Sequence, residues 1–218
     1  MALSTSPELY RQIETVETFI GIAGQTMRPI RDLAYQLRFR DQEDFKRYIH
    51  GKEVLDIGSG LNGLAIDVIL QNIPARVTSI NPLAARPDFE ARQKAAIELY
   101  SPHLFSDSSP EDIETARKEA NRNTLPLFAH DLRGLADASF DVVIDNMAVF
   151  FYADRLQKLA LVKSIEEMQR VCRGSIRVGD PARYGEIPTN WKEMTLREMG
   201  IKYSPYGIGF EIPSSKVA

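Results

Sequence analysis

Apolar side chains in the first fifty residues recur at intervals of three and four, the spacing that places them on one face of a helix. The first such run extends from Pro7 to about Ile22. A Ser–Pro pair marks its start and glycines mark its end. A second run follows Pro29, and a third, shorter one covers residues 41–49. We therefore predict an N-terminal helical cap over residues 1–50.

The pattern changes at Glu53. A continuous apolar strand at 54–57 runs into a glycine turn at 58–63, a helix follows, and Pro74 separates that helix from a second strand at 76–80. Strand–helix–strand alternation implies right-handed crossovers and a parallel sheet. The predicted fold class is therefore α/β, with a doubly wound, mostly parallel sheet over residues 51–218.

The rest of the chain gives the same signals. The stretch from 81 is too long for a simple connection, so we predict a helical insertion over about 82–126, with one helix at 88–100 and another opened by Ser109 and Pro110. The later elements are strands at 127–130, 140–146 and 175–179, helices at 153–171 and 191–199, and a terminal hairpin at 201–212. The unbroken apolar middle of 140–146 is typical of a strand buried on both faces.

Composition narrows the class of partner. The 218 residues carry a net charge of -3, without the basic excess that phosphate binding needs, so we expect no nucleic-acid partner. No apolar run is long enough to span a bilayer, and the N-terminal residues lack the apolar core of a signal peptide. A cytoplasmic protein without a membrane partner is expected, and the oligomeric state stays open.

Cysteine and histidine content argues against a metal centre. The single Cys172 excludes an internal disulfide and a cysteine-built zinc site, and its place at the end of a predicted helix suits a buried apolar thiol. The three histidines show no ligand spacing. We expect no metal.

The strongest chemical signal is the run Val54-Leu55-Asp56-Ile57-Gly58-Ser59-Gly60. Glycines between a strand and a helix let a ligand approach the backbone near the N-terminus of the helix. Glycines at 58, 60 and 63 also fit the fingerprint of dinucleotide sites, so they are ambiguous alone. A nicotinamide site would place an acid at the end of the second strand, where this chain has Asn81.

From about Lys52 to Asp180 the chain resembles the class I S-adenosylmethionine (SAM)-dependent methyltransferases. The run 54–60 resembles the first motif of that family, Asp131-Leu132 matches its adenine-contacting acid and neighbour, and 140–146 matches its fourth-strand motif. The terminal hairpin is similar to the antiparallel pair that closes the seven-stranded sheet of the family. The resemblance implies a seven-stranded, Rossmann-like sheet and SAM as the cofactor.

The resemblance assigns the methionine part of the cofactor to the glycine turn and the strands beside it. Asp56 and the turn residues Gly58, Ser59 and Gly60 would hold this part, and Asn146, at the end of the fourth strand, would help to bind the amino acid end. These five positions form one half of the expected cofactor site.

The other half would bind the nucleoside. Asn81 would face the ribose hydroxyls, the Asp131 carboxylate would accept from the adenine amino group, and the Leu132 N–H would donate to the ring. The family usually has an acid at position 81, and an amide loses charge-assisted hydrogen bonding worth on the order of 1–2 kcal/mol. Asn62 stands where a glycine is common, which points to a reshaped turn.

A sulfonium methyl group is already activated, so positioning and exclusion of water can be enough for its transfer. Candidate catalytic residues near the expected mouth of the site are His130, Tyr152, Asp180 and Tyr184. The residues after the fourth strand lack the Asp/Asn-Pro-Pro-Tyr run of amino-methyltransferases acting on DNA bases. We expect the helical cap and the insertion to roof a pocket over the strand ends, which favours a small molecule.

Three functions are compatible with these features. The leading hypothesis is a SAM-dependent methyltransferase that acts on a small-molecule acceptor by direct in-line transfer. A catalytically inactive relative, kept as a binding or scaffold protein, is the second, and Asn81 is its best support. An NAD(P)-dependent oxidoreductase is the third and rests on the glycine spacing alone.

Overall fold

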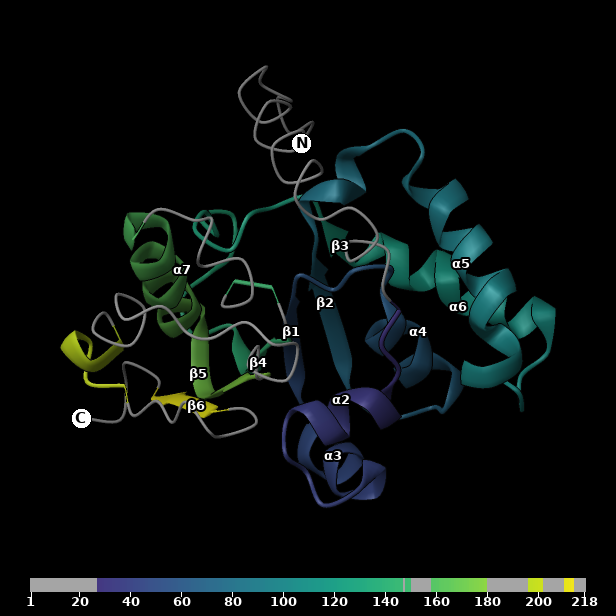
Figure 1. The fold of residues 1–218 in the computed structure, drawn as a ribbon, viewed down its shortest axis with the longest axis horizontal. Helices are drawn as coiled ribbons and strands as arrows, with labels where there is room; N and C mark the ends of the chain where they lie inside the picture. The colour runs from purple at the N-terminus through teal and green to yellow at the C-terminus, as the bar shows by residue number, and fades with distance from the viewer. Residues whose placement is uncertain (1–26, 147, 150–157, 180–195, 202–209, 214–218) are drawn as a thin grey trace.

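The computed structural model describes residues 27–146, 148–149, 158–179, 196–201 and 210–213 (Figure 1). The predicted helix at 7–22 lies outside these ranges, as do most of the predicted helix 191–199 and the first half of the terminal hairpin.

One six-stranded sheet organises the described residues, in the order β3-β2-β1-β4-β5-β6. The first five strands are parallel, and β6 runs antiparallel to β5, with Ile176 opposite Ile212. The bounds are β1 Glu53–Ile57, β2 Arg76–Ile80, β3 Thr124–Leu125, β4 Phe140–Asp145, β5 Cys172–Val178 and β6 Phe210–Pro213. The strand order turns outward in both directions from β1 and β4, so the predicted doubly wound, mostly parallel sheet is confirmed.

Helices cover both faces of this sheet. Helices α2 (Ile30–Gln36), α3 (Gln42–Ile49), α4 (Gly63–Leu70) and α6 (Pro110–Arg122) share one apolar core with Val54, Val142 and Ile144. Helix α7 (Lys158–Val171) packs on the other face, in a second core with Leu55, Ile57 and Val143. Successive residues along β1, and likewise along β4, thus point into opposite cores, as the pleat of a strand requires. Both strands are therefore buried on both faces.

The third strand lies earlier in the chain than predicted. Strand β3 is Thr124–Leu125, and residues 127–130 are irregular and end in a turn in which Asp131 N–H donates to Phe128 O at 3.0 Å. Pro126 explains the difference, because it has no N–H to continue the ladder with β2. The described sheet has six strands where the resemblance implied seven, and the first half of the terminal hairpin, which would supply another strand, lies outside the described residues.

The insertion contains the two predicted helices. Helix α5 spans Phe89–Leu104, four residues beyond the predicted end at 100, after a short 3-10 helix η2 at Pro82–Ala85. Helix α6 begins where the sequence predicted, since the Ser109 hydroxyl caps it by accepting from Asp112 N–H at 3.1 Å.

Helix α3 does not lie over the carboxyl ends of the strands, as the roofed pocket required. It packs on the face of β5, where the Tyr48 hydroxyl bonds to that of Ser175 and the Arg177 guanidinium lies over the Tyr48 ring at 5.4 Å. The segment just before α2 does reach the strand ends, because Arg28 Nη1 donates to Asn146 O at 2.8 Å.

Candidate functional site

The glycine turn (residues 58–63) joins β1 to α4 in a compact left-handed path. Gly58 and Gly60 have φ angles of 66° and 58°. Residues other than glycine, Asn and Asp rarely adopt such positive values. The N–H groups of Gly58 and Ser59 both donate to Ile80 O, at 2.9 and 3.2 Å. The turn is therefore fastened to the end of β2.

Asn62 keeps this path instead of reshaping it. Its φ and ψ of 63° and 30° lie in the left-handed helical region, where glycine is the usual residue and Asn the best tolerated substitute. Helix α4 then starts at Gly63, the last residue of the predicted turn. The expected distortion at Asn62 is therefore not found.

Two glycines allow neighbouring segments to approach the turn closely. A methyl group on Gly58 would meet the Ala148 side chain, and one on Gly63 would lie 2.4 Å from Arg28 N. These contacts bring the segment before α2 and the loop after β4 against the turn, so three parts of the chain far apart in sequence meet there.

A buried carboxylate lies at the end of β1. Asp56 is 4% exposed, and burial raises its pKa to about 7 against the attraction of the Arg28 guanidinium and with the repulsion of Asp145. In β4, next to β1, Asp145 is paired with Ile57, and its Oδ1 accepts from Val149 N–H at 3.1 Å. Two acidic side chains thus lie at the ends of the two central strands, on opposite faces of the sheet: Asp56 on the face of Val54 and Asp145 on the face of Val143.

Asn146 adds an acceptor to this end of the sheet. Its Nδ2 donates to Gln36 Oε1 at 2.7 Å, and its carbonyl accepts from Arg28. The side chain is only 2% exposed, yet within the described part of the chain its Oδ1 has no hydrogen-bond partner. A buried acceptor without a donor is costly, which makes Asn146 Oδ1, packed against Gly179, a candidate partner for a ligand N–H group.

These residues fit the amino acid end of SAM. An ammonium group has three donors and a positive charge, which complements Asn146 Oδ1 and the Asp56 carboxylate. Arg28 and Gln36, which orient Asn146, went unnoticed in the sequence because no motif marks them and both precede the sheet by many residues.

Asn81 has a structural task. Its Oδ1 accepts from Leu83 N–H at 2.9 Å and caps η2, while its Nδ2 donates to Gly60 O at 2.5 Å. The side chain therefore ties β2 to the glycine turn, and a carboxylate at this position would face the Gly60 carbonyl without a donor. The local geometry therefore disfavours an acid at position 81, even though an acid there would bind the ribose hydroxyls better than an amide does.

Asp131 and Leu132 already have protein partners. Arg133 contacts both Asp131 oxygens, at 2.7 and 2.8 Å, and these hydrogen bonds lower the pKa of the carboxyl group. The Leu132 N–H donates to Glu167 Oε2 at 2.9 Å. An adenine ring would have to displace the Glu167 carboxylate and share Asp131 with Arg133, so the adenine assignment stays a prediction.

Of the candidate catalytic residues, His130 is described. Its ring stacks on Phe128 with the centroids 5.3 Å apart, and burial lowers its pKa below the ordinary value. The other candidates, Tyr152, Asp180 and Tyr184, lie outside the described residues.

A cavity of about 520 Å³ lies between η2, the start of α5 and the end of α6, and no residue of the glycine turn lines it. Its lining combines charged residues such as Glu90 and Lys94 with Asn121 and Thr124. Within the described ranges, no three His, Cys, Asp or Glu side chains gather as a metal-binding group. Nor does any helix there combine the length and apolarity needed to cross a membrane.

Many solved structures with a similar fold are SAM-dependent methyltransferases, and the [4+2]-cyclase SpnF also has this fold. One from Aquifex aeolicus is 15% identical, covers 80% of this chain and 86% of its own, and gives a TM-score of 0.43. The Burkholderia thailandensis 1,6-didemethyltoxoflavin N1-methyltransferase, crystallised with 1,6-didemethyltoxoflavin and S-adenosylhomocysteine, is 14% identical over 82% of this chain and 65% of its own, with a TM-score of 0.42. One from Methanosarcina mazei is 18% identical over 62% of this chain, with a TM-score of 0.40.

These likenesses are distant. The chain spans just over half of the Methanosarcina mazei protein, 55% of its length. No protein-family model matches the chain, and no curated protein does. The similarity concerns the fold alone, so the activity has to be inferred from the residues of this chain.

Proposed function

We propose that this protein binds SAM at the carboxyl ends of β1 and β4 and transfers its methyl group to a small-molecule acceptor. The observation that carries the proposal is the buried acceptor Asn146 Oδ1 at the same strand ends as the desolvated Asp56, beside a left-handed glycine turn. This combination suits a cationic amino acid group held against the backbone.

The residues of this chain would bind and orient the cofactor. Gln36 and Arg28 hold Asn146 from two sides, and its Oδ1 faces Gly179 of the segment after β5. Asp56, raised in pKa by burial, would ionise when an ammonium cation arrives, because the new charge replaces the lost hydration. Bound SAM supplies an activated methyl group, and a dry, fixed site favours in-line transfer.

A dinucleotide oxidoreductase is less well supported. The mostly parallel sheet of the classic dinucleotide fold binds the ribose through an acid at the end of its second strand. Here that position is Asn81, whose oxygen and nitrogen already bond to Leu83 and Gly60. Strand β6 is antiparallel to β5, which is another departure from a simple parallel sheet.

Isothermal titration of the purified chain with SAM, S-adenosylhomocysteine and NAD tests the proposal. We expect dissociation constants in the micromolar range for at least one of the first two ligands and no heat of binding for NAD. A folded chain that binds neither methyl donor nor product would overturn the proposal and favour a scaffold protein. Binding of NAD alone would favour the oxidoreductase.

A further inference from the structure

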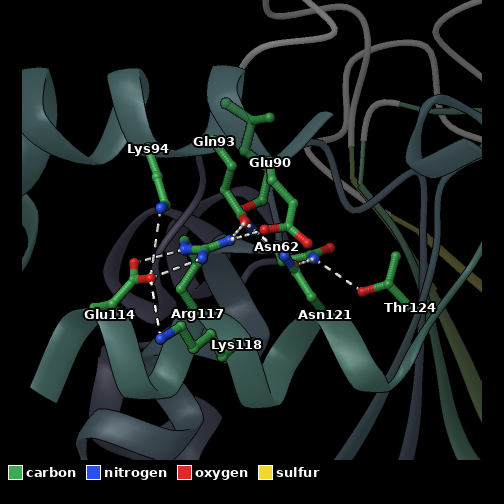
Figure 2. Close-up of polar contacts among 10 residues, drawn as sticks. Asn62, Glu90, Gln93, Lys94, Glu114, Arg117, Lys118, Asn121 and Thr124 are labelled. Carbon is green, nitrogen blue, oxygen red and sulfur yellow. Dashed lines mark hydrogen bonds and ion pairs between the residues drawn. The ribbon is translucent and has the colours of Figure 1, made fainter. Parts of the chain in front are cut away.

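Asn62 is anchored to the insertion by its side chain. Its Nδ2 donates to Asn121 Oδ1 at 2.9 Å and to Thr124 Oγ1 at 2.8 Å, while its Oδ1 accepts from the Ser59 hydroxyl at 2.8 Å. The side chains of α5 and α6 point toward one another between the two helices and reach the turn at one end (Figure 2). Two of the three side-chain bonds that hold Asn62 therefore come from the insertion, one from Asn121 at the end of α6 and one from Thr124 in β3.

Gln93, on α5, connects the backbone of the turn to the interior of the helix pair. Its Nε2 donates to Leu61 O and to Asn121 Oδ1, both at 3.1 Å. Its Oε1 accepts from Asn121 Nδ2 at 2.9 Å and from Arg117 Nη1 at 3.2 Å. The side chain is fully buried and uses both donors and both lone pairs, so it has a single orientation.

Arg117, on α6, fixes that orientation. It is 1% exposed, and its guanidinium also donates to Glu114 at 2.8 and 2.9 Å and to Glu90 at 3.3 Å. These hydrogen bonds hold the pKa of Glu114 down at about 2. Apolar side chains would pack two helices together at least as well as a buried arginine paired with the partly exposed Glu114, so packing alone does not account for this arginine.

We propose that the α5–α6 pair positions the glycine turn for its ligand: Arg117 orients Gln93, and Gln93 together with Asn121 fixes Leu61 and Asn62. All three are positioning residues, since they act through the turn. The inference rests on the proposed function only in naming SAM and S-adenosylhomocysteine as the ligands of the turn.

The variant Gln93→Glu separates positioning from stability. One carboxylate oxygen still accepts from Arg117, now with opposite charge, and the volume is unchanged. The other oxygen replaces Nε2 and faces two acceptors, Leu61 O and Asn121 Oδ1. We expect a melting temperature near that of the wild type, S-adenosylhomocysteine affinity about tenfold weaker, and hydrogen exchange at the amides of 60–63 about tenfold faster.

Two further variants complete the test. Ile113 is a core residue of α6 that makes no contact with the hydrogen-bonded side chains of Arg117, Gln93 and Asn121 through a polar group. We expect Ile113→Val to lower the melting temperature and to leave ligand affinity and hydrogen exchange in the turn unchanged. Asn62→Gly retains the left-handed conformation but removes the anchor, so affinity should fall as in Gln93→Glu even if the latter folds poorly.

Hydrogen exchange is measured on the ligand-free chain, so it decides the inference independently of the cofactor. If the wild type binds neither ligand, the proposed function fails, and faster exchange in Gln93→Glu and Asn62→Gly still supports positioning. Wild-type exchange in both variants would overturn the inference. So would a loss of affinity in Ile113→Val as large as that in Gln93→Glu.

Discussion

The carboxyl group of Asp56 is buried near the end of a central strand, and its pKa differs from the ordinary value of an aspartate. Burial raises the value from 3.8 to about 7, while Arg28 opposes the shift and Asp145 adds to it. A free chain near neutral pH is therefore a mixture of protonated and ionised forms at this position. A cationic ligand would select the ionised form.

This shift makes a prediction for stability. The folded chain holds the proton more tightly than the unfolded chain, so the contribution is present in full below about pH 4 and is lost as the pH rises through 7. At about 1.4 kcal/mol per pKa unit, the loss is on the order of 4 kcal/mol. Urea denaturation at pH 4.0–8.0 (roughly the window between the two pKa values) should show a smaller loss for Asp56→Asn than for the wild type; parallel curves would contradict the assignment.

Helix α2 depends on an element distant in sequence. It has no side-chain cap of its own, and Ile30 N–H instead donates to Asp67 Oδ2 of α4 at 2.8 Å. Helix α4 also meets the segment just before α2, since Gly63 packs against the backbone of Arg28. The path of the N-terminal segment to the strand ends is therefore set by α4.

Substitution of Gly63 tests this packing. In Gly63→Ala the added methyl group would lie 2.4 Å from Arg28 N and 2.7 Å from Arg28 O, so the backbone must move. Overpacking of this kind costs typically 1–3 kcal/mol. Gly134→Ala is the matched control, because nothing lies within 4 Å of the added group. Chemical denaturation of both variants should show a loss in the first alone, and equal stabilities would refute the close contact.

The polar site lies at the point where the order of strands in the sheet reverses direction. Strands β1 and β4 are neighbours, and the chain continues from them toward opposite edges of the sheet, the arrangement at which open α/β sheets bind their ligands. The glycine turn, Asp56 and Asn146 all lie at this end. Ligand binding there should therefore stabilise the two central strands and the fold around them.

Thermal unfolding measures this coupling. A ligand at about 100 times its dissociation constant adds about 2.7 kcal/mol, which for a chain of this size raises the melting temperature by roughly 5–10 °C. We expect such a shift with S-adenosylhomocysteine and none with NAD at the same concentration. A shift with NAD alone would count against the proposed cofactor.

Local signals in the sequence were enough for most elements. The strands at β1, β2 and β4 follow from short apolar runs, and α3 and α6 begin at the side-chain caps Asp41 and Ser109. Such signals depend on residues a few positions apart. The third strand was misplaced because the apolar run 127–130 resembles a strand, whereas Pro126 ends the ladder before it.

The sequence alone determined the α/β class, the parallel core and the presence of a glycine turn beside Asp56, since these depend on periodicity and on short-range spacing. Only the tertiary structure decided what surrounds the turn. Asn81 ties β2 to Gly60, and Gln93 reaches Leu61 from a helix 32 residues away. These partners are chosen by packing of distant elements, and buried polar groups must then pair with whatever packing brings near.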